Sequence, residues 1–369
     1  MKRIVPRVRA LVILPVQDLA TQVYKVFRTY AEKTNLRLKL LSGQKSFAQE
    51  QSELVLKGID GFHSLADIIV ATPGRLVDHL QNTEGFSLSH LRYLIIDEAD
   101  RVMEDVQNDW LSHVEKAVYN QSNGRIKPTY INSKWEVGSI PLQKLLFSAT
   151  LSQNPEKLQQ LQLYEPKLYT SAIDPNDILA NEEVVQIGTP KELQESILMV
   201  DNSLNKPMLL INLIKKKKMK KVLVFTKSIE NSHSLTMILQ ALNLKAAEIS
   251  SQLKKGQRGK ILNQFKNDKL EVIVATDALA RGIDIGMIDF VVSYDCPKFV
   301  KTYVHRVGRT ARAGRTGQAI TMIENKQLKA FKIMLKQIGK DGEFPQEDIE
   351  VTAKDLKVYE KAVEGINKE

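Results

Sequence analysis

Short apolar runs that alternate with longer amphipathic stretches restrict the fold of this chain more than any other feature. The runs are rich in Val, Ile and Leu, which is typical of strands buried on both faces of a parallel sheet. The amphipathic stretches between them predict the helices that cover such a sheet. We therefore predict an α/β fold with mostly parallel sheets. Its strands are expected at residues 10–16, 36–41, 67–71, 91–97 and 144–148, and at residues 221–226, 246–249, 271–276, 290–294 and 318–323.

The length of 369 residues and the two groups of strands predict two domains. Residues 170–190 contain two prolines and no clear periodicity, as is typical of a linker. We expect a first domain at residues 1–171, a linker at 172–190 and a second domain at 191–369. Residues 120–141 are polar and are interpreted as a surface insertion, and the residues after 325 as polar helices.

The charge balance indicates a polyanionic partner. The chain has 53 Lys and Arg against 43 Asp and Glu, a formal net charge of +10. This charge favours either nucleic acid or an acidic membrane surface. The single cysteine, Cys296, cannot form an internal disulfide and argues against a zinc site built on thiolates. Arg7 and Arg9 interrupt the first apolar run, so we interpret it as a strand rather than a signal peptide, and no run approaches the ~20 residues of a membrane span.

The lysines at residues 215–218, continued by Lys220 and Lys221, allow two interpretations. They can form a patch for RNA or nuclear import, or they can end a helix, where cations complement the helix dipole. We favour the helix C-terminus, because an apolar strand follows directly.

Three carboxylates follow an apolar run, in the sequence Asp97-Glu98-Ala99-Asp100. Parallel α/β sheets bind ligands beyond the carboxyl ends of their strands. There an Asp can hold the Mg²⁺ of a nucleotide and a neighbouring Glu can polarise the attacking water. An acidic helix N-terminus is the structural alternative. A second run in the same half ends in Ser148-Ala149-Thr150, whose hydroxyls can link the carboxylates to the other domain by hydrogen bonds.

The second half carries a segment rich in arginine. Arg306, Arg309 and Arg312 recur every three residues, so a helix would place them on one face. That face is unfavourable unless an anion binds, and Arg suits bidentate phosphate recognition; a solvated basic helix is the alternative. Upstream, a second apolar run ends in Thr276-Asp277. The chain then leads to Arg281-Gly282-Ile283-Asp284.

In this order and spacing, the four segments resemble motifs of the DEAD-box RNA helicases. Residues 97–100 resemble motif II, 148–150 motif III, 281–284 motif V and 305–312 motif VI. Residues 15–20 resemble motif Ia of that family, 72–75 motif Ib and 224–226 motif IV. Arg258 stands where the family has an RNA-facing arginine, and Phe265 resembles the aromatic of motif IVa. The resemblance implies two tandem RecA-like domains, each a mostly parallel sheet flanked by helices, with ATP and Mg²⁺ as cofactors.

The resemblance also implies roles for individual residues. Asp97 is expected to hold Mg²⁺ through water, Glu98 to orient the hydrolytic water, and Arg309 and Arg312 to reach the γ-phosphate. Asp284 is expected to contact the ATP ribose. Other residues expected at the nucleotide are Gly282, His305 and Arg306, and those expected to couple hydrolysis to domain closure are Ser148 and Thr150. RNA phosphates and 2′-hydroxyls are expected at Pro15, Gln17, Gly43, Thr72, Pro73, Gly74, Arg75, Phe225, Arg258, Thr276 and Asp277.

The chain departs from the family pattern in two places. Gln17 stands where motif Ia usually has an Arg, and Asp18 replaces the usual Glu. The family's core opens with a strand that leads to the ATP-phosphate-binding loop Gly-x-x-x-x-Gly-Lys-Thr, and the 369 residues contain no such loop. We therefore expect the first domain of this polypeptide to lack its P-loop strand, and we expect no ATP hydrolysis from these residues alone.

An ATP-dependent RNA helicase, an RNA-dependent ATP hydrolase, is the leading interpretation. A non-catalytic RNA-binding isoform or fragment is the alternative for this polypeptide by itself, and a DNA helicase of the same superfamily is a third. The insertion and residues 151–158 resemble a nucleolar subfamily linked to the large ribosomal subunit. That resemblance implies ribosome biogenesis, rRNA processing and pre-ribosomal RNA and proteins as partners. A monomer in the nucleus and nucleolus, with no membrane contact, is expected.

Overall fold

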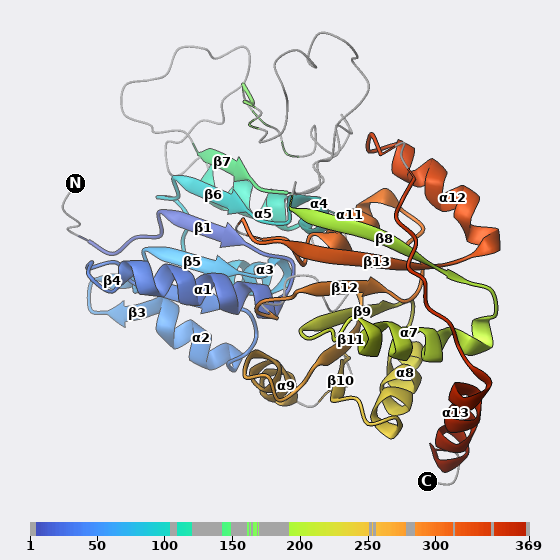
Figure 1. The fold of residues 1–369 in the computed structure, drawn as a ribbon. Helices are drawn as coiled ribbons and strands as arrows, with labels where there is room; N and C mark the ends of the chain where they lie inside the picture. The colour runs from blue at the N-terminus through green and yellow to red at the C-terminus, as the bar shows by residue number, and fades with distance from the viewer. Residues whose placement is uncertain are drawn as a thin grey trace. The chain divides into compact units, whose positions relative to one another are not determined.

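The computed structural model describes residues 5–103, 109–119, 142–148, 161, 163, 165–167, 169, 192–250, 253, 256–277, 285–312, 314–340 and 343–366. The chain divides into two compact units, Met1–Tyr169 and Thr170–Glu369 (Figure 1). The expected linker and insertion lie outside the described residues, so their boundaries remain predictions.

The first unit contains a five-stranded sheet in the order β2-β5-β1-β6-β7, in which all neighbouring strands are parallel. Each of the five strands predicted in this half is present; four lie within their predicted ranges, and β7 begins one residue earlier than predicted. Their bounds are β1 Ala10–Ile13, β2 Leu38–Leu41, β5 Ile68–Ala71, β6 Tyr93–Ile96 and β7 Gln143–Leu146. The helices are α1 Gln17–Ala31, α2 Phe47–Leu54, α3 Pro73–Asn82, α4 Ala99–Val102 and α5 Trp110–Val118. A hairpin of β3 Val55–Gly58 and β4 Gly61–Ser64 is antiparallel and was not predicted.

Alternate residues of the central strand β1 supply the two faces of this sheet. Leu11 and Ile13 pack with the apolar side chains of α3 and α5, whereas Val12 and Leu14, the residue after the strand, pack with α1. The four side chains are at most 2% exposed. A strand buried on both faces needs a continuous apolar run, which explains why β1 was visible in the sequence.

The second unit contains a six-stranded sheet in the order β10-β11-β9-β12-β13-β8, again with parallel neighbours. The strands are β8 Leu193–Val200, β9 Val222–Thr226, β10 Ala246–Ile249, β11 Val272–Thr276, β12 Phe290–Ser293 and β13 Gly317–Glu324. The helices are α7 Lys206–Lys216, α8 Ile229–Ala241, α9 Gln257–Lys266, α11 Val300–Val307, α12 Asn325–Lys336 and α13 Ala353–Ile366, with a 3-10 turn η3 at Ser203–Asn205. Strand β8 was not predicted, because Gln194, Glu195 and Ser196 interrupt its apolar residues.

The helices of the second unit cover both faces of its sheet. Val222 and Val224 of β9 pack with the apolar side chains of α7 and α8, while Leu223 and Phe225 pack toward α9, α11 and α12. Helix α7 ends at Lys216, with Lys215 and Lys216 in its last turn, which confirms the prediction of a basic helix C-terminus.

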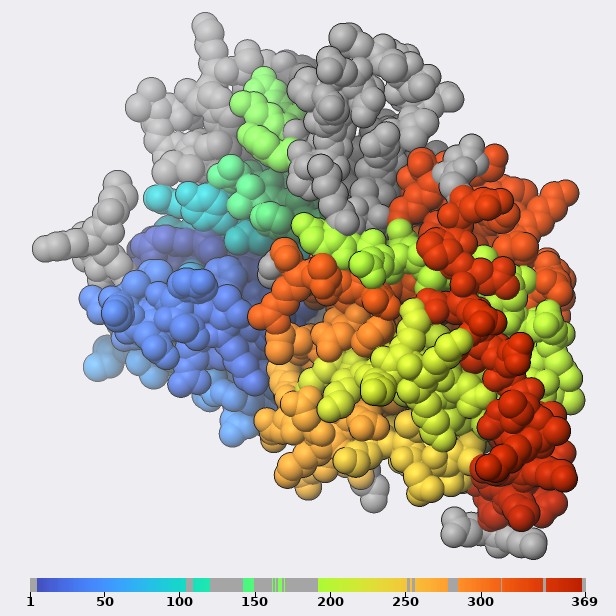
Figure 2. Space-filling view, in the orientation of Figure 1, coloured from blue at the N-terminus to red at the C-terminus, as the bar shows by residue number. Residues whose placement is uncertain are grey.

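The C-terminal residues close the outer edge of this sheet. Ile197 of β8 donates its N–H to Pro345 and accepts from the N–H of Glu347, so residues 345–347 run alongside β8. Helix α13 then lies against α8 and α7 (Figure 2), and Tyr359 contributes to the core beneath them. In the described part of the chain, no helix is long and apolar enough to cross a membrane.

Candidate functional site

The predicted site residues of the first unit follow its parallel strands. Because the carboxyl ends of parallel strands meet at one edge of a sheet, the residues that follow them meet there as well. This edge is formed by Pro15 after β1, Gly43 after β2, Thr72 after β5, Asp97 after β6 and Ser148 after β7. The structure therefore brings the described residues of motifs Ia, Ib, II and III to one edge.

Asp97 and Glu98 occupy a tight turn at the end of β6. The N–H of Asp97 donates to the carbonyl of Ile13 at 3.0 Å, which ties the turn to β1. The N–H of Glu98 donates to Asp97 Oδ1 at 2.9 Å. Glu98 has a φ of 49°, a left-handed conformation that is uncommon outside glycine and frequent at functional sites. The turn thus holds both carboxylates at the edge before α4 begins.

Asp100 links this turn to the strand beside it. Its buried carboxylate accepts a hydrogen bond from Ser148 Oγ at 2.9 Å, and the N–H of Ala99 donates to the carbonyl of Phe147 at 3.0 Å. Ser148 therefore contacts the fourth residue of the Asp97–Asp100 segment. Thr150, the other hydroxyl of that prediction, lies outside the described residues.

The surroundings of Asp97 fit a magnesium ion held through water. Burial raises the pKa of the Asp97 carboxyl, because desolvation opposes its charge. A bound cation would offset this cost, and carboxylate oxygen is the ligand that Mg²⁺ prefers. Among the described residues no three acidic, His or Cys side chains are grouped as a metal site.

Gln17 and Gly43 lie close together at the same edge. Gly43 has a φ of 74°, and a Cβ at this position would lie 3.2 Å from Gln17 Nε2. Gln17 is exposed at the start of α1. The turn at Gly43 therefore needs glycine for its left-handed conformation, whereas the exposed side chain of Gln17 could move aside for a Cβ.

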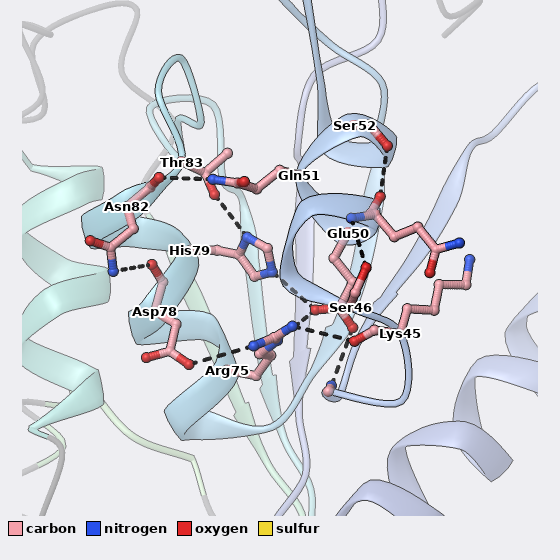
Figure 3. A network of polar contacts seen from close by, with 12 residues as sticks. Lys45, Ser46, Glu50, Gln51, Ser52, Arg75, Asp78, His79, Asn82 and Thr83 are labelled. Atoms are coloured by element: carbon pink, nitrogen blue, oxygen red, sulfur yellow. Dashed lines mark hydrogen bonds and ion pairs between the residues drawn. The ribbon is translucent and has the colours of Figure 1, made fainter.

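The residues of motif Ib form the start of α3. Thr72 precedes the helix, Pro73 is its first residue, and Gly74 and Arg75 complete its first turn. A proline at the first helical position loses no intrahelical hydrogen bond, which explains this start. Arg75 is held by an ion pair to Glu50 of α2, in the polar cluster shown in Figure 3. The sequence contained no signal for the pairing of Arg75 with Glu50.

In the second unit, the buried Arg306 and the half-buried Asp277 form a bidentate pair. Arg306 Nε and Nη2 donate to the two carboxylate oxygens of Asp277 at 2.7 and 2.8 Å, and Nη1 donates to the carbonyl of Asp295. The guanidinium lies over the ring of Phe225, 5.2 Å from its centroid. Arg306 is 3% exposed and Phe225 2%, so in this structure both side chains hold the end of the sheet together. Phe225 offers no exposed ring surface to RNA here.

The prediction of one helical face for the three arginines is wrong. Helix α11 ends at Val307 with Gly308 as its C-cap, so Arg309 and Arg312 follow the helix. The chain turns because Thr310 Oγ1 donates to the carbonyl of Ile288 at 2.7 Å and Ala311 adopts a left-handed φ of 53°. Arg312 is exposed and its Nε donates to the carbonyl of Gly308, while Arg309 is half-buried. Arg309 and Arg312 therefore lie on the turn after α11 and not on a face of the helix.

The other predicted residues of the second unit occupy separate places. Thr276 is buried at the end of β11, His305 is buried in α11, and Arg258 is half-buried in the first turn of α9. Gly282 and Asp284 lie outside the described residues. The described edge of the second sheet therefore holds Thr276, Asp277 and Arg306.

The sequence of this chain matches two protein-family models and several known proteins. Residues 2–158 match the family model DEAD/DEAH box helicase, and residues 205–314 match the helicase conserved C-terminal domain. The ATP-dependent RNA helicase DDX51 of Homo sapiens is 45% identical over 92% of this chain and 53% of its own length. The DEAD-box ATP-dependent RNA helicase 1 of Oryza sativa is 37% identical over 97% of this chain and 74% of its own length.

Solved structures show the same fold. Dbp5 of S. cerevisiae bound to RNA and ADP BeF3 has a TM-score of 0.69 at 22% identity, with 97% of this chain and 81% of that chain covered. The DEAD-box helicase Mss116 bound to ssRNA and UDP-BeF has a TM-score of 0.73 at 22% identity, with 96% and 67% covered. Each unit of this chain is thus a RecA-like α/β domain, and the two stand in tandem.

The chain belongs to the family of DEAD-box ATP-dependent RNA helicases. It spans about half the length of the human relative that it matches.

Proposed function

We propose that this protein is an ATP-dependent RNA helicase that couples ATP hydrolysis to RNA remodelling. The observation that carries the proposal is the turn at the end of β6, which holds Asp97 and Glu98 at the sheet edge and ties Asp100 to Ser148. Two carboxylates so close suit a reaction in which one group holds a cation and the other orients water.

The residues of the first unit would divide the work of hydrolysis. Asp97 would hold Mg²⁺ through water, and the ion would supply charge stabilisation for the phosphates. Glu98 would accept a hydrogen bond from the attacking water and orient it toward the γ-phosphate. In the second unit Arg309 and Arg312 would donate hydrogen bonds to the oxygens of the transferred phosphoryl group, on which negative charge develops. Gly282, Asp284, His305 and Arg306 belong to the proposed nucleotide site, and Ser148 and Thr150 to the proposed coupling with domain closure.

RNA would bind through its backbone. In the first unit Pro15, Gln17, Gly43 and the residues 72–75 are proposed to face phosphates and 2′-hydroxyls. In the second unit the residues proposed to contact RNA are Arg258, Thr276 and Asp277. Phe225 would act indirectly, because its ring packs against the guanidinium of Arg306. Contacts of this kind carry no base information, so binding is expected to tolerate any RNA sequence.

We also propose a place for the protein in ribosome biogenesis, as a monomer in the nucleus and nucleolus that acts on pre-ribosomal RNA. The support is the likeness of the insertion and of residues 151–158 to a nucleolar subfamily. Imaging of the tagged protein and sequencing of cross-linked RNA would test this place. A uniform cytoplasmic signal with no enrichment of pre-ribosomal RNA would contradict it.

Hydrolysis is tested by measuring ATP turnover of the full-length protein with and without RNA. We expect RNA to stimulate turnover and Glu98→Gln to abolish it, because the amide cannot orient water as the carboxylate does. Glu84→Gln, at an exposed position of the same unit, is the matched control and should leave turnover unchanged. Turnover that persists in Glu98→Gln would overturn the proposed role.

A further inference from the structure

Glu50 is a buried carboxylate outside the motifs. It lies on α2 and is 1% exposed. Its Oε1 accepts a hydrogen bond from the backbone N–H of Gly43 at 3.2 Å. Its Oε2 accepts from Arg75 Nε at 2.6 Å and lies 3.1 Å from His79 Nε2 (Figure 3). One side chain thus joins the turn after β2 to the first and second turns of α3.

His79 supports the carboxylate from the side away from solvent. It is fully buried, and its Nδ1 lies 2.8 Å from Thr83 Oγ1. Its ring stacks on Phe47, with centroids 4.5 Å apart and an angle of 18° between the planes. Burial lowers the pKa of His79, which favours the neutral form of the ring. A neutral ring whose Nε2 donates to Glu50 has an Nδ1 that accepts from the hydroxyl of Thr83.

Arg75 is oriented by the same contacts. Its guanidinium lies over the ring of Phe47, 4.9 Å from the centroid, and its Nε is used by Glu50. Among the residues that the structure describes, the outer nitrogens have only long contacts, Nη2 to the carbonyl of Lys45 at 3.4 Å and Nη1 to Asp78 Oδ2 at 3.9 Å. The side chain of Arg75 keeps 19% of its surface exposed. Its outer edge can therefore accept an anion while its inner edge is fixed.

We propose that Glu50 is a positioning residue for RNA binding. It holds the turn at Gly43 and the outer guanidinium edge of Arg75 in one arrangement, so that two segments from different strands meet the same stretch of RNA backbone. This inference rests on the proposed RNA function of Gly43 and Arg75. A role in stability alone would not require a carboxylate, because apolar side chains of similar volume often replace buried ion pairs without loss.

The charge of Glu50 gives the test its direction. Removing a negative charge near an RNA-binding surface strengthens RNA binding if bulk electrostatics alone act. A positioning role predicts the opposite. In Glu50→Gln the amide is a weaker acceptor for Arg75 and Gly43, and its NH₂ group competes for the same space.

The experiment measures binding of a fluorescent single-stranded RNA to the full-length protein by anisotropy, with the melting temperature of each variant. We expect Glu50→Gln to weaken RNA binding roughly tenfold, the order of one charge-assisted hydrogen bond. The control is Glu53→Gln, on the same helix and with the same change of charge. Glu53 is half-buried and pairs with Lys45 and Lys39, so this variant should bind RNA as tightly as the wild type or more tightly.

A double variant separates positioning from stability. If Glu50 acts through Arg75, then Glu50→Gln in an Arg75→Ala background should weaken RNA binding little further. Glu50→Asp keeps the charge with a shorter reach, and it serves if Glu50→Gln fails to fold; it should also weaken binding. A lower melting temperature with unchanged RNA affinity in both variants would overturn the inference while the proposed function stands. A wild-type protein that does not bind RNA would overturn the proposed function as well.

Discussion

At the scale of single residues, Arg306 and Arg312 show how one sequence pattern serves two purposes. Both belong to the same repeat, yet Arg306 is buried and bonded to Asp277, while Arg312 is exposed on a turn. A buried arginine is tolerated only when its donors are satisfied, and Asp277 and the carbonyl of Asp295 satisfy them. Arg306 therefore has a structural role in the second unit whatever it contributes at the nucleotide.

Replacing Arg306 by alanine should destabilise the second unit by about 3 kcal/mol, the low end for breaking a buried ion pair, because Asp277 keeps some exposure. Urea denaturation followed by circular dichroism measures the loss. Hydrogen exchange in β9 and β11 shows where it falls. Lys329→Ala, at an exposed position of α12, should change the free energy of unfolding by less than about 0.5 kcal/mol. Equal effects of the two variants would contradict the structural role.

His79 predicts a pH dependence of stability. Its pKa in the folded protein is lowered from 6.5, chiefly by burial, with Arg75 acting in the same direction and Glu50 and Asp78 opposing it. The neutral form is favoured in the folded state. The stability that neutral His79 contributes to the folded protein is therefore fully present above pH 6.5. It is lost as the pH falls through the lowered pKa of His79.

His79→Gln keeps a donor for Glu50 but does not titrate. The loss of stability between about pH 7.5 and about pH 5 should therefore be smaller in the variant than in the wild type. Urea denaturation at the two pH values measures the difference. His113→Gln, at a half-buried position of α5, is the control. The linkage is refuted if His79→Gln and the wild type lose the same stability.

At the scale of elements, the turn after α11 depends on a close approach between two segments. A Cβ on Gly317 would lie 2.1 Å from Thr310 Oγ1 and 2.5 Å from the backbone N of Ala311. The backbone cannot give way as a flexible side chain can. The first residue of β13 therefore has to be glycine for the turn that carries Arg309 and Arg312 to close.

Gly317→Ala should destabilise the protein by about 1–3 kcal/mol, as overpacking does, and should displace the turn with Arg309 and Arg312. The matched control is Gly259→Ala in α9, where a Cβ meets nothing within 4 Å. Alanine there should stabilise the helix by about 0.5–1 kcal/mol. The melting temperatures of both variants, compared with that of the wild type, test these two predictions. A stabilising Gly317→Ala would mean that the turn is not packed as described.

At the scale of the whole molecule, the net charge of +10 and the proposed RNA surface make different predictions. Bulk charge attracts any polyanion, whereas a built surface depends on particular side chains. Arg258 in the first turn of α9 is proposed to contact RNA phosphate, and Lys260 is exposed two residues further on the same helix.

Arg258→Ala should weaken binding about equally for RNAs of unrelated sequence and lower the salt slope of log K by about one. Lys260→Ala, with the same loss of charge, should have a smaller effect. Anisotropy titrations over a range of salt, with single-stranded RNA and duplex DNA, measure this. If both nucleic acids bind equally and Arg258→Ala changes neither, only bulk charge remains.

The sequence by itself determined most of the strands and the sheet edge at which the proposed site residues of the first unit lie. Ten apolar runs became parallel strands, because burial on both faces needs a local apolar run. The described motif residues of the first unit lie at one edge of its sheet because parallel strands end there. The hairpin β3–β4 and strand β8 were missed, because their exposed or polar residues lack that signal.

The tertiary structure alone decided the partners of the polar side chains. Glu50 pairs with Arg75 over 25 residues and with His79 over 29, and Arg306 pairs with Asp277 over 29. The end of α11, set by the contact of Thr310 with Ile288, also needed the packed fold. Periodicity reports which side chains are buried, because burial follows the local backbone. It does not report which groups meet, because that depends on how elements far apart in sequence pack together.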